Sequence, residues 1–375
     1  SRYQGIGAYI VELTKALALL TDEERGGLAI AALVDWRGGR PLVAPLAEAA
    51  EAVGEWPGAA YSDRGFVWRR RRELGAATRR AGARLLHLPE PLGMPLFPGC
   101  PRVVTCHDLI PLLLADVYSR RPRLARLRAF ALEWPRAHFS RRIIAVSETT
   151  KRDLVRHLGV QPRRIAVVPH GVDADRFNER AAEGERETLR ARYGLPARYV
   201  LHVGTADRRK GIPTLVAAFA ARAPEPTGLV LAGRIFPPQR PAVERAIAAH
   251  DAAGRVFLLD HVPDDDLPAL YRQATAFVFP SRYEGFGLPL LEAFACGAPA
   301  VAAANPALLE VGGDAFLAVP VGDEAALGEA IARVLSDAAL RGRLVAAGKR
   351  RAAPFTWRAA ALSAAAVYRD VLAGR

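Results

Sequence analysis

The segment 276–302 constrains the fold of this chain more than any other. An apolar run, Ala276–Phe279, leads into a loop with two glycines, and a helical stretch begins near Leu288 with a proline in its first turn, where proline fits. A glycine ends that stretch, and a second apolar run begins at Pro299. Such runs are typical of parallel strands covered on both faces. The segment therefore predicts a strand–loop–helix–strand unit of an α/β fold.

The same alternation of apolar runs and amphipathic helical stretches extends through the whole chain. The predicted strands are Ala29–Val34, Leu85–Leu88, Arg102–Thr105, Arg142–Val146, Ile165–Val168, Tyr199–Val203, Gly228–Ala232, Val256–Leu259, Ala276–Phe279, Pro299–Ala302 and Ala315–Val319. Strands that alternate with helices indicate parallel, doubly wound sheets.

The length of 375 residues exceeds one ordinary core, so two domains are expected. The polar stretch His170–Gly194 separates the two sets of strands and predicts a linker followed by a first helix. We expect an N-terminal domain over 1–175 and a C-terminal domain over 176–354. The segment 355–375 predicts a long helix that crosses back to the first domain.

Composition limits the class of protein. No apolar stretch reaches the roughly 18 residues of a membrane-spanning helix, and the N-terminus lacks the order of a signal peptide. The cysteines, Cys100, Cys106 and Cys296, are odd in number and fit no zinc spacing. Free thiols in a reducing compartment follow, so a cytoplasmic location is expected.

The net charge is +13, and two basic clusters stand out, Trp68–Arg72 and Arg120–Arg128. Such a surface attracts polyanions, either nucleic acid or anionic lipid headgroups. The alternative is a solvated surface in an arginine-biased proteome, because only four of the basic residues are lysines. No nucleic-acid-binding motif is present, so specific nucleic-acid binding is not expected. Peripheral contact with the anionic inner face of a membrane stays as a hypothesis.

Two carboxylates accompany the glycine loop of 276–302. Gly285 and Gly287 lie just before a helix N-terminus at the end of a strand, where backbone N–H groups and the helix dipole suit a diphosphate. Glu284 lies in the loop and Glu292 one turn further into the helix. A carboxylate can accept two hydrogen bonds from the diol of a ribose or sugar. The alternatives are helix-end charge compensation for Glu284 and surface solvation for Glu292.

Two glutamates separated by seven residues, in the frame FPSRYEGFGLPLLEAFACGAPAVA, resemble the signature of glycosyltransferase family 4. That family has the GT-B fold, in which two Rossmann-like domains face a central cleft, and it retains the anomeric configuration of a nucleotide-sugar donor. The resemblance implies that Glu292 holds the ribose hydroxyls and that Glu284 contacts the transferred sugar. It also implies that the amides of Phe286, Gly287 and Leu288 meet sugar and phosphate.

The segment Val200–Gly211, VLHVGTADRRKG, is similar to a second part of the family pattern. Arg209 and Lys210 would neutralise the diphosphate and stabilise the departing nucleotide. By itself, this pair would suggest only an exposed basic turn. Thr205 stands where many members of the family have an arginine, and the resemblance leaves Arg208 or Arg209 to supply that phosphate contact.

In the first half, RVVTCHDLIPL places His107 directly after a predicted strand. A lone histidine is more often structural, but HDLIPL is similar to family members that transfer mannose, in which the histidine contacts the donor sugar. Gly5 and Gly7 match a glycine-rich loop near the donor phosphate and acceptor. Because that loop follows a first strand in the family, we expect this strand to lie upstream of Ser1 and residues 1–6 to be poorly held.

Together these features predict a retaining hexosyltransferase that moves mannose, with GDP-mannose favoured and a UDP-sugar possible, to a glycan, lipid-linked or small-molecule acceptor. Cell-surface polysaccharide biosynthesis is the expected setting. No cofactor and no metal are expected, because Asp264–Asp266 are interpreted as the acidic start of a helix. The alternatives are another GT-B enzyme, such as a nucleotide-sugar epimerase or a phosphorylase, and a non-catalytic or polyanion-binding protein.

Overall fold

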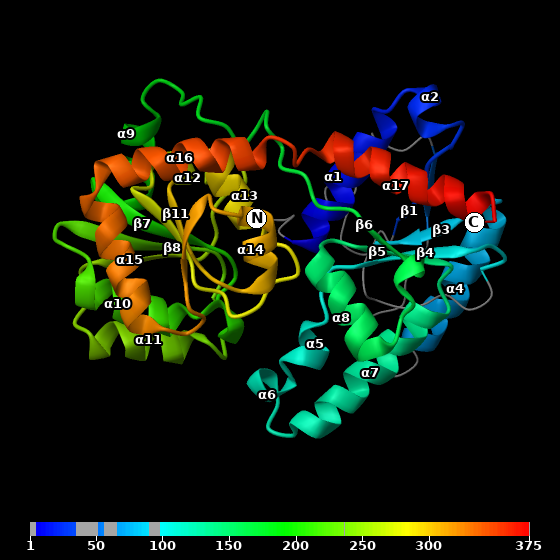
Figure 1. Ribbon diagram of the computed structural model, residues 1–375, viewed down its shortest axis with the longest axis horizontal. Helices are drawn as coiled ribbons and strands as arrows, with labels where there is room; N and C mark the ends of the chain where they lie inside the picture. Colours follow the sequence, from blue (N-terminus) through cyan, green and yellow to red (C-terminus); the bar gives the residue numbers. More distant parts are fainter. Residues whose placement is uncertain (1–4, 35–51, 56–65, 90–97, 236, 375) are drawn as a thin grey trace. The chain divides into compact units, whose positions relative to one another are not determined.

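The computed structural model describes residues 5–34, 52–55, 66–89, 98–235 and 237–374. Contacts divide the chain into two compact units (Figure 1). The C-terminal unit contains Val172–Thr356 together with Asp116–Tyr118, and the N-terminal unit contains the described residues of 5–115, 119–171 and 357–374.

The C-terminal unit is built on a six-stranded parallel sheet. Its strands are β7 (Arg198–Val203), β8 (Thr227–Ala232), β9 (Val256–Leu259), β10 (Ala276–Phe279), β11 (Ala300–Ala303) and β12 (Phe316–Val319). They lie in the order β12-β11-β10-β7-β8-β9, so the direction in which the chain progresses through the sheet reverses between β7 and β10. Ligands of doubly wound sheets bind at such a switch point, at the carboxyl ends of the strands.

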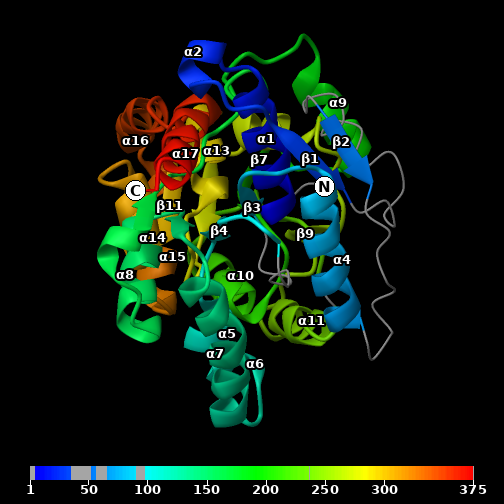
Figure 2. The same cartoon turned by 90° about the vertical axis from the view of Figure 1, so that its right-hand side faces the viewer.

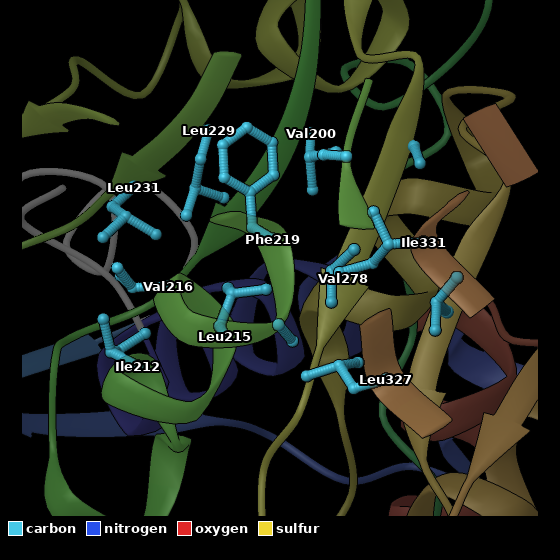
Figure 3. Close-up of a cluster of buried hydrophobic side chains, with 14 of the residues drawn as sticks. Val200, Ile212, Leu215, Val216, Phe219, Leu229, Leu231, Val278, Leu327 and Ile331 are labelled. Atoms are coloured by element: carbon cyan, nitrogen blue, oxygen red, sulfur yellow. The ribbon is translucent and has the colours of Figure 1, made fainter. Parts of the chain in front are cut away.

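Helices cover both faces of this sheet. They are α9 (Glu185–Tyr193), η4 (Arg208–Lys210), α10 (Ile212–Arg222), α11 (Arg240–Ala249), α12 (Leu267–Gln273), α13 (Leu288–Ala295), α14 (Pro306–Gly312), α15 (Glu324–Ser336) and α16 (Ala338–Ala352). On one face, Val200, Leu229 and Val278 of the sheet meet Phe219 of α10 and Ile331 of α15 (Figure 3). Burial of each such side chain contributes about 1.5–3 kcal/mol.

The opposite face of the sheet carries the alternate residues of the same strands. Phe277 of β10 packs against the ring of Tyr271 in α12, with centroids 5.4 Å apart, and against Phe279. Apolar residues at both odd and even positions of β10 are therefore fully buried. The sequence 276–279 is a continuous apolar run because helices cover both faces of the sheet at β10.

The N-terminal unit contains a parallel sheet in the order β3-β4-β5-β6 and a separate parallel pair, β1 and β2. The strands are β1 (Ala31–Val34), β2 (Ala52–Glu55), β3 (Leu86–Leu88), β4 (Arg102–Cys106), β5 (Arg142–Ala145) and β6 (Ile165–Val167). The helices in this part of the chain are α1 (Ile6–Ala18), α2 (Asp22–Arg25), α4 (Phe66–Arg80), α5 (Ile110–Leu113), α6 (Ala115–Tyr118), α7 (Pro122–His138), α8 (Glu148–Leu158) and η3 (Pro162–Arg164).

The C-terminal helix α17 (Trp357–Leu372) belongs to the N-terminal unit and packs along α1 (Figure 2). Ala360, Ala361 and Ala364 are fully or almost fully buried, so small side chains allow close packing of this helix. Just before it, Val172 and Thr356 form an isolated parallel bridge within the C-terminal unit. The two segments at which the chain leaves and re-enters the N-terminal unit are therefore paired.

The predicted α/β class with two parallel-sheet units is confirmed, and each predicted strand is present within one or two residues of its bounds. The strand β2 was not predicted, because its sequence, AVGE, has neither an apolar run nor β-branched enrichment. The expectation about the chain's start covers residues 1–6. Residues 1–4 lie outside the described residues, whereas Gly5 is the N-cap of α1 and Ile6 is its first residue. Among the described helices, none is long and apolar enough to span a membrane.

Candidate functional site

Two loops meet at the switch point of the C-terminal sheet. The first, 204–211, follows β7, and the second, 281–287, follows β10, which pairs with β7 in parallel. The backbone N–H of Arg282 donates to the carbonyl of Arg209 at 2.8 Å and so ties the loops together. Because β7 and β10 are parallel, the loops that follow them both lie at the carboxyl edge of the sheet, where ligands of doubly wound sheets bind.

Glu284 is the centre of a compact charged cluster. Its Oε1 accepts hydrogen bonds from Lys210 Nζ at 2.6 Å, Arg209 Nη1 at 2.5 Å and Ser281 Oγ at 2.5 Å. All of these donors reach the same oxygen, and among the described residues none hydrogen-bonds to Oε2. The cluster therefore holds one carboxylate oxygen of Glu284 between two cations and a hydroxyl group.

The charges of this cluster depend on each other. Burial by itself would raise the pKa of Glu284, but Lys210 and Arg209 outweigh it and hold the pKa below its ordinary value. Burial lowers the pKa of Lys210, while Glu284 raises it. Glu284 is therefore ionised at neutral pH and balances one of the two positive charges. The sequence suggested an exposed basic turn as the alternative for Lys210, whereas the structure buries this lysine, which retains only 7% of its exposure.

A second set of contacts fixes the cluster. Ser281 is fully buried, and its backbone carbonyl accepts from Asn305 Nδ2 at 2.8 Å. Asn305 also caps α14, because its Oδ1 accepts from Leu308 N at 3.0 Å. The sequence analysis gave Ser281 no role. Its position three residues before Glu284 in a loop is the only available signal, and serine is too common in loops for this to be decisive.

Gly287 is the N-cap of the helix α13, and no side chain caps this end of the helix. Gly287 has φ 113° and ψ 45°, which favour glycine, and a Cβ there would lie 2.4 Å from Leu308 Cδ2. Before it, the ring of Phe286 is buried and packs edge-on against Phe355, with centroids 5.9 Å apart. Leu288 is the first residue of the helix. The positive end of the α13 dipole therefore lies next to the glutamate cluster in the chain.

Substitution of Gly287 is expected to damage the helix start directly. We expect Gly287→Ala to reduce the free energy of unfolding by about 2–4 kcal/mol, because of the positive φ and the contact with Leu308. The matched control is Gly342→Ala in α16, where nothing lies within 4 Å of the added Cβ. That control is expected to be neutral or to stabilise by about 0.4–1 kcal/mol. Denaturant unfolding measures both, and equal stability of the two variants would contradict the prediction.

Glu292 lies further along α13 and is only partly buried. Its Oε2 accepts from Tyr271 OH at 2.8 Å, and Tyr271 is the only hydrogen-bond partner of this carboxyl group among the described residues. Burial raises the pKa of Glu292 to about 7, although Tyr271 and Arg176 act against this rise. The carboxyl group is thus desolvated with limited compensation, which differs from the surface solvation that the sequence left open.

His202 is a further residue of this region that the sequence analysis did not single out. It lies near the carboxyl end of β7, fully buried, and its Nδ1 donates to the carbonyl of Val278 at 3.0 Å. Burial lowers its pKa to about 4, so the ring is neutral at pH 7.

The loop after β7 contains Thr205, which is partly buried. In the same loop, Asp207 Oδ1 accepts from Arg209 N at 3.0 Å.

In the N-terminal unit, His107 follows β4 as predicted, at the carboxyl edge of that sheet. Its Nε2–H donates to the carbonyl of Pro89 at 2.7 Å, and its ring lies 4.7 Å from that of Tyr9 in α1. Gly5, with φ 67°, precedes α1, and Gly7 lies in its first turn. Burial lowers the pKa of His107 to about 4. His107 and the glycine segment are therefore neighbours through Tyr9.

The structure thus brings together Arg209, Lys210 and Glu284 in direct contact, and it places Gly287 and Glu292 in the adjoining helix. His107, Gly5 and Gly7 form a separate group in the other unit. Asp264–Asp266 were predicted to form the acidic start of a helix. Asp266 is indeed the N-cap of α12, but its side chain makes no capping hydrogen bond.

The carboxylates of that acidic segment pair with arginines instead. Asp266 lies 2.8 Å from Arg192, and Asp264 lies 3.8 Å from Arg176. In the part of the chain that the structure describes, no group of three or more histidine, cysteine, aspartate or glutamate residues is placed to hold a metal ion.

Both halves of the chain match models of known protein families. Residues 3–176 match the family model "Glycosyltransferase Family 4", and residues 185–351 match "Glycosyl transferases group 1". The serotype-specific mannosyltransferase WbdA of Escherichia coli is 30% identical over 261 residues, which are 68% of this chain and 32% of that protein. The D-inositol 3-phosphate glycosyltransferase of Salinispora arenicola is 33% identical over 278 residues, 69% of this chain and 61% of that protein. The chain thus spans less than two thirds of these relatives.

Solved structures show the same fold. Sucrose-phosphate synthase from Thermosynechococcus elongatus has a TM-score of 0.77 at 25% identity, covering 99% of this chain and 94% of that chain. HepE from Anabaena, in complex with UDP and glucose, has a TM-score of 0.77 at 18% identity, covering 98% and 96%. These neighbours and the two parallel-sheet units define the GT-B class of glycosyltransferases. Because both halves also match the corresponding family models, the chain belongs to glycosyltransferase family 4.

Proposed function

We propose that this protein transfers a hexose from a nucleoside-diphosphate sugar to a hydroxyl group of an acceptor, with retention of the anomeric configuration. The observation that carries the proposal is the convergence of Arg209 and Lys210 on Glu284 at the switch point. The cluster has one more positive than negative charge, and it adjoins an uncapped helix N-terminus in the chain. A diphosphate matches both features.

Each residue has a proposed role. Arg209 and Lys210 bind the diphosphate and stabilise the negative charge that grows as the sugar leaves. Amides around Gly287 add hydrogen bonds to phosphate and sugar. Glu284 orients the sugar through Oε2, which the cations leave unoccupied. Glu292 accepts hydrogen bonds from the ribose diol.

The proposed chemistry needs no protein nucleophile. The acceptor oxygen forms a bond to the anomeric carbon on the face from which the diphosphate departs, and the bond from that carbon to the phosphate oxygen breaks. The acceptor's proton passes to the departing phosphate. The protein then contributes orientation and electrostatic stabilisation. The contact of His107 with the donor sugar, and those of Gly5, Gly7 and Thr205 near the phosphates, stay predictions of the family resemblance.

Mannose is the favoured sugar and GDP-mannose the favoured donor, supported by the HDLIPL motif and by mannosyltransferase-named relatives at about 30% identity. A UDP-sugar is the alternative, since the HepE structures hold UDP. An epimerase or phosphorylase with the same fold is the rival activity, and it would release product without a new glycosidic bond to an acceptor.

A thermal-shift screen of GDP, UDP and their sugars tests the donor site. At about 100 times its dissociation constant, the correct nucleotide is expected to stabilise the fold by about 2.7 kcal/mol, which raises the melting temperature by roughly 5–10 °C. Lys210→Ala is expected to abolish most of this rise. The matched control is Lys349→Ala, which removes a half-exposed lysine of α16 in the same unit. If no nucleotide shifts the wild type, or if both variants respond equally, the donor site is assigned wrongly.

We further propose that α7 contacts an anionic membrane. Large apolar side chains are exposed on it, with Leu127 at 64% and Leu132 at 72%, among the exposed arginines Arg123, Arg126 and Arg128. A helix that carries both kinds of side chain has the chemistry of an interfacial helix on anionic lipid.

Flotation with vesicles of equal parts phosphatidylcholine and phosphatidylglycerol tests this contact. Leu127→Asp and Leu132→Asp are each expected to weaken binding about tenfold, because each loses buried apolar area and adds a like charge. The control is Leu309→Asp, which changes a leucine of the C-terminal unit that is 43% exposed. Unchanged flotation of the α7 variants, or none by the wild type, would remove the membrane contact from the proposal.

A further inference from the structure

An arginine-lined pocket opens at the amino edge of the N-terminal sheet, the edge opposite to His107. It has a volume of about 680 Å³, enough for a ligand of moderate size. The arginines that line it are Arg102, Arg141, Arg142, Arg163 and Arg164. They come from the starts of β4 and β5 and from η3, which leads into β6. None of the residues that line the pocket is acidic.

Part of this cluster has a structural role. Arg164 Nη2 donates to the carbonyls of Ala137 and His138, each at 3.0 Å, and Arg102 Nη2 donates to that of Phe139 at 2.6 Å. These two arginines satisfy carbonyls at the C-terminus of α7, which a helix leaves unpaired. Burial lowers the pKa of Arg164, and the neighbouring Arg141 lowers it further.

The remaining arginines are not needed for that capping. Arg141 donates to the carbonyl of Gly374, and Arg163 Nε donates to Gln161 Oε1 at 3.0 Å, both at exposed positions. Arg142 forms an ion pair with Asp370, with 3.5 Å between Nη2 and Oδ2. A strong excess of positive charge is thus gathered in one concave place.

An aromatic rim adjoins the pocket. Phe139 lines the pocket and is 60% exposed, and Trp134 lies edge-on to it with ring centroids 6.2 Å apart. Trp134 also stacks on His138, another lining residue, at 4.1 Å. Through Trp134, which lies in α7, the pocket is continuous with the helix that bears exposed Leu127 and Leu132. Cationic donors beside exposed rings match a phosphate group attached to an apolar body.

We propose that this pocket binds the phosphate group of an anionic phospholipid while the Trp134–Phe139 rim contacts its acyl region. Guanidinium groups suit phosphate oxygens because they offer paired, planar donors. The proposal deepens the membrane contact of α7 and rests on it, but it does not depend on the transfer chemistry. A free phosphate compound shares the same chemistry, and the experiment separates the two sources.

Vesicle binding of the full chain tests the pocket, again with equal parts phosphatidylcholine and phosphatidylglycerol. The pocket variant is Arg141→Gln with Arg163→Gln, which leaves the capping arginines intact. We expect it to bind about 25-fold more weakly, since each arginine near an anionic surface accounts for about fivefold. The matched control is Arg80→Gln with Arg156→Gln, two exposed arginines of the same unit outside the pocket. We expect the control pair to lose less than about threefold.

A second arm uses sn-glycerol 3-phosphate and inorganic phosphate, with binding followed by calorimetry. We expect weak binding to the wild type, and we expect Trp134→Ala to weaken vesicle binding without changing this weak phosphate binding. The proposal would be overturned if the wild type bound free phosphate tightly and the pocket variant lost this binding while its vesicle binding stayed unchanged. The pocket would then be assigned to a free phosphate compound. Equal losses by the pocket and control pairs would also overturn it.

These vesicle and phosphate experiments distinguish the lipid site in the pocket from the membrane contact of α7 and from the donor site. All variants should keep the wild-type melting temperature and the nucleotide-induced shift. Absence of vesicle binding by the wild type removes both the α7 contact and the pocket's lipid. If the wild type binds vesicles but the pocket variant and the control variant lose binding equally, only the proposed lipid site in the pocket is rejected. Failure of the donor screen leaves both vesicle results unaffected.

Discussion

Replacement of Glu284 by glutamine is expected to separate donor binding from transfer. The change removes the carboxylate that balances Arg209 and Lys210. Loss of one partner from a buried ion pair costs about 3–5 kcal/mol, because the opposite charges stay buried without a counter-ion. We therefore expect the melting temperature of the unliganded variant to fall by about 6–12 °C.

A bound diphosphate supplies the missing negative charge to the same two cations. The nucleotide-induced rise in melting temperature should therefore be at least as large in Glu284→Gln as in the wild type. Transfer should nevertheless fall by about 10²–10³-fold, because the sugar loses its orienting carboxylate. Steady-state kinetics at saturating donor measure this loss.

The control for Glu284→Gln is Glu329→Gln in α15, an exposed glutamate of the same unit. It should change neither melting temperature nor rate. Two outcomes would contradict the proposed role of the cluster. One is a Glu284→Gln variant as stable and as active as the wild type, and the other is a variant that loses the nucleotide-induced shift while it stays folded.

Replacement of Glu292 by glutamine is expected to stabilise the protein while it weakens donor binding. The pKa of Glu292 is raised from 4.5 to about 7. A carboxyl group with a raised pKa in the folded state destabilises the fold when it ionises, so stability is lost as pH rises from about 4.5 to 7. At about pH 8 the effect amounts to at most about 3 kcal/mol, less where water reaches the carboxylate.

Glutamine at this position cannot ionise, so Glu292→Gln should melt higher than the wild type at about pH 8 and similarly below about pH 5. Its affinity for the nucleotide should fall by roughly 10–100-fold, because hydrogen bonds to a charged acceptor are worth about 1.5–3 kcal/mol. Wild-type affinity should rise with pH through about 7, whereas that of the variant should stay flat. Parallel pH profiles for the two proteins would contradict the assignment of Glu292 to the ribose.

Much of the fold could be predicted from local sequence. The strand β10 is an uncharged apolar run because both of its faces are buried, and β7 is buried throughout after its exposed first residue, Arg198. The glycines of the loops that follow these strands have positive φ values, such as that of Gly287. The order of the strands could not be derived from periodicity, because it depends on which strands pair across long separations. The strand β2 carries too weak a pattern to be recognised.

The sequence allowed candidate residues for the site to be predicted, but not how their side chains are arranged. The loop positions of Arg209 and Glu284 indicated a diphosphate and a sugar contact, and their roles stay predictions. The convergence of Arg209 and Lys210 on one oxygen of Glu284 depends on side-chain rotamers and on buried Ser281, which no spacing in the sequence reveals. The arginine pocket combines the starts of separate strands, so only the three-dimensional structure brings Arg102 and Arg163 together.

The anomeric configuration of the product tests the proposed function most directly. The protein is incubated with the nucleotide sugar selected by the thermal-shift screen and with a panel of glycan and lipid-linked acceptors, and the new linkage is identified by NMR spectroscopy. We expect a glycoside with the same anomeric configuration as the donor, formed together with one nucleoside diphosphate per bond, and formed about 10²–10³-fold more slowly by Glu284→Gln. An inverted linkage would contradict retention, and release of nucleotide or an isomerised sugar without any glycosidic bond would contradict the transferase itself.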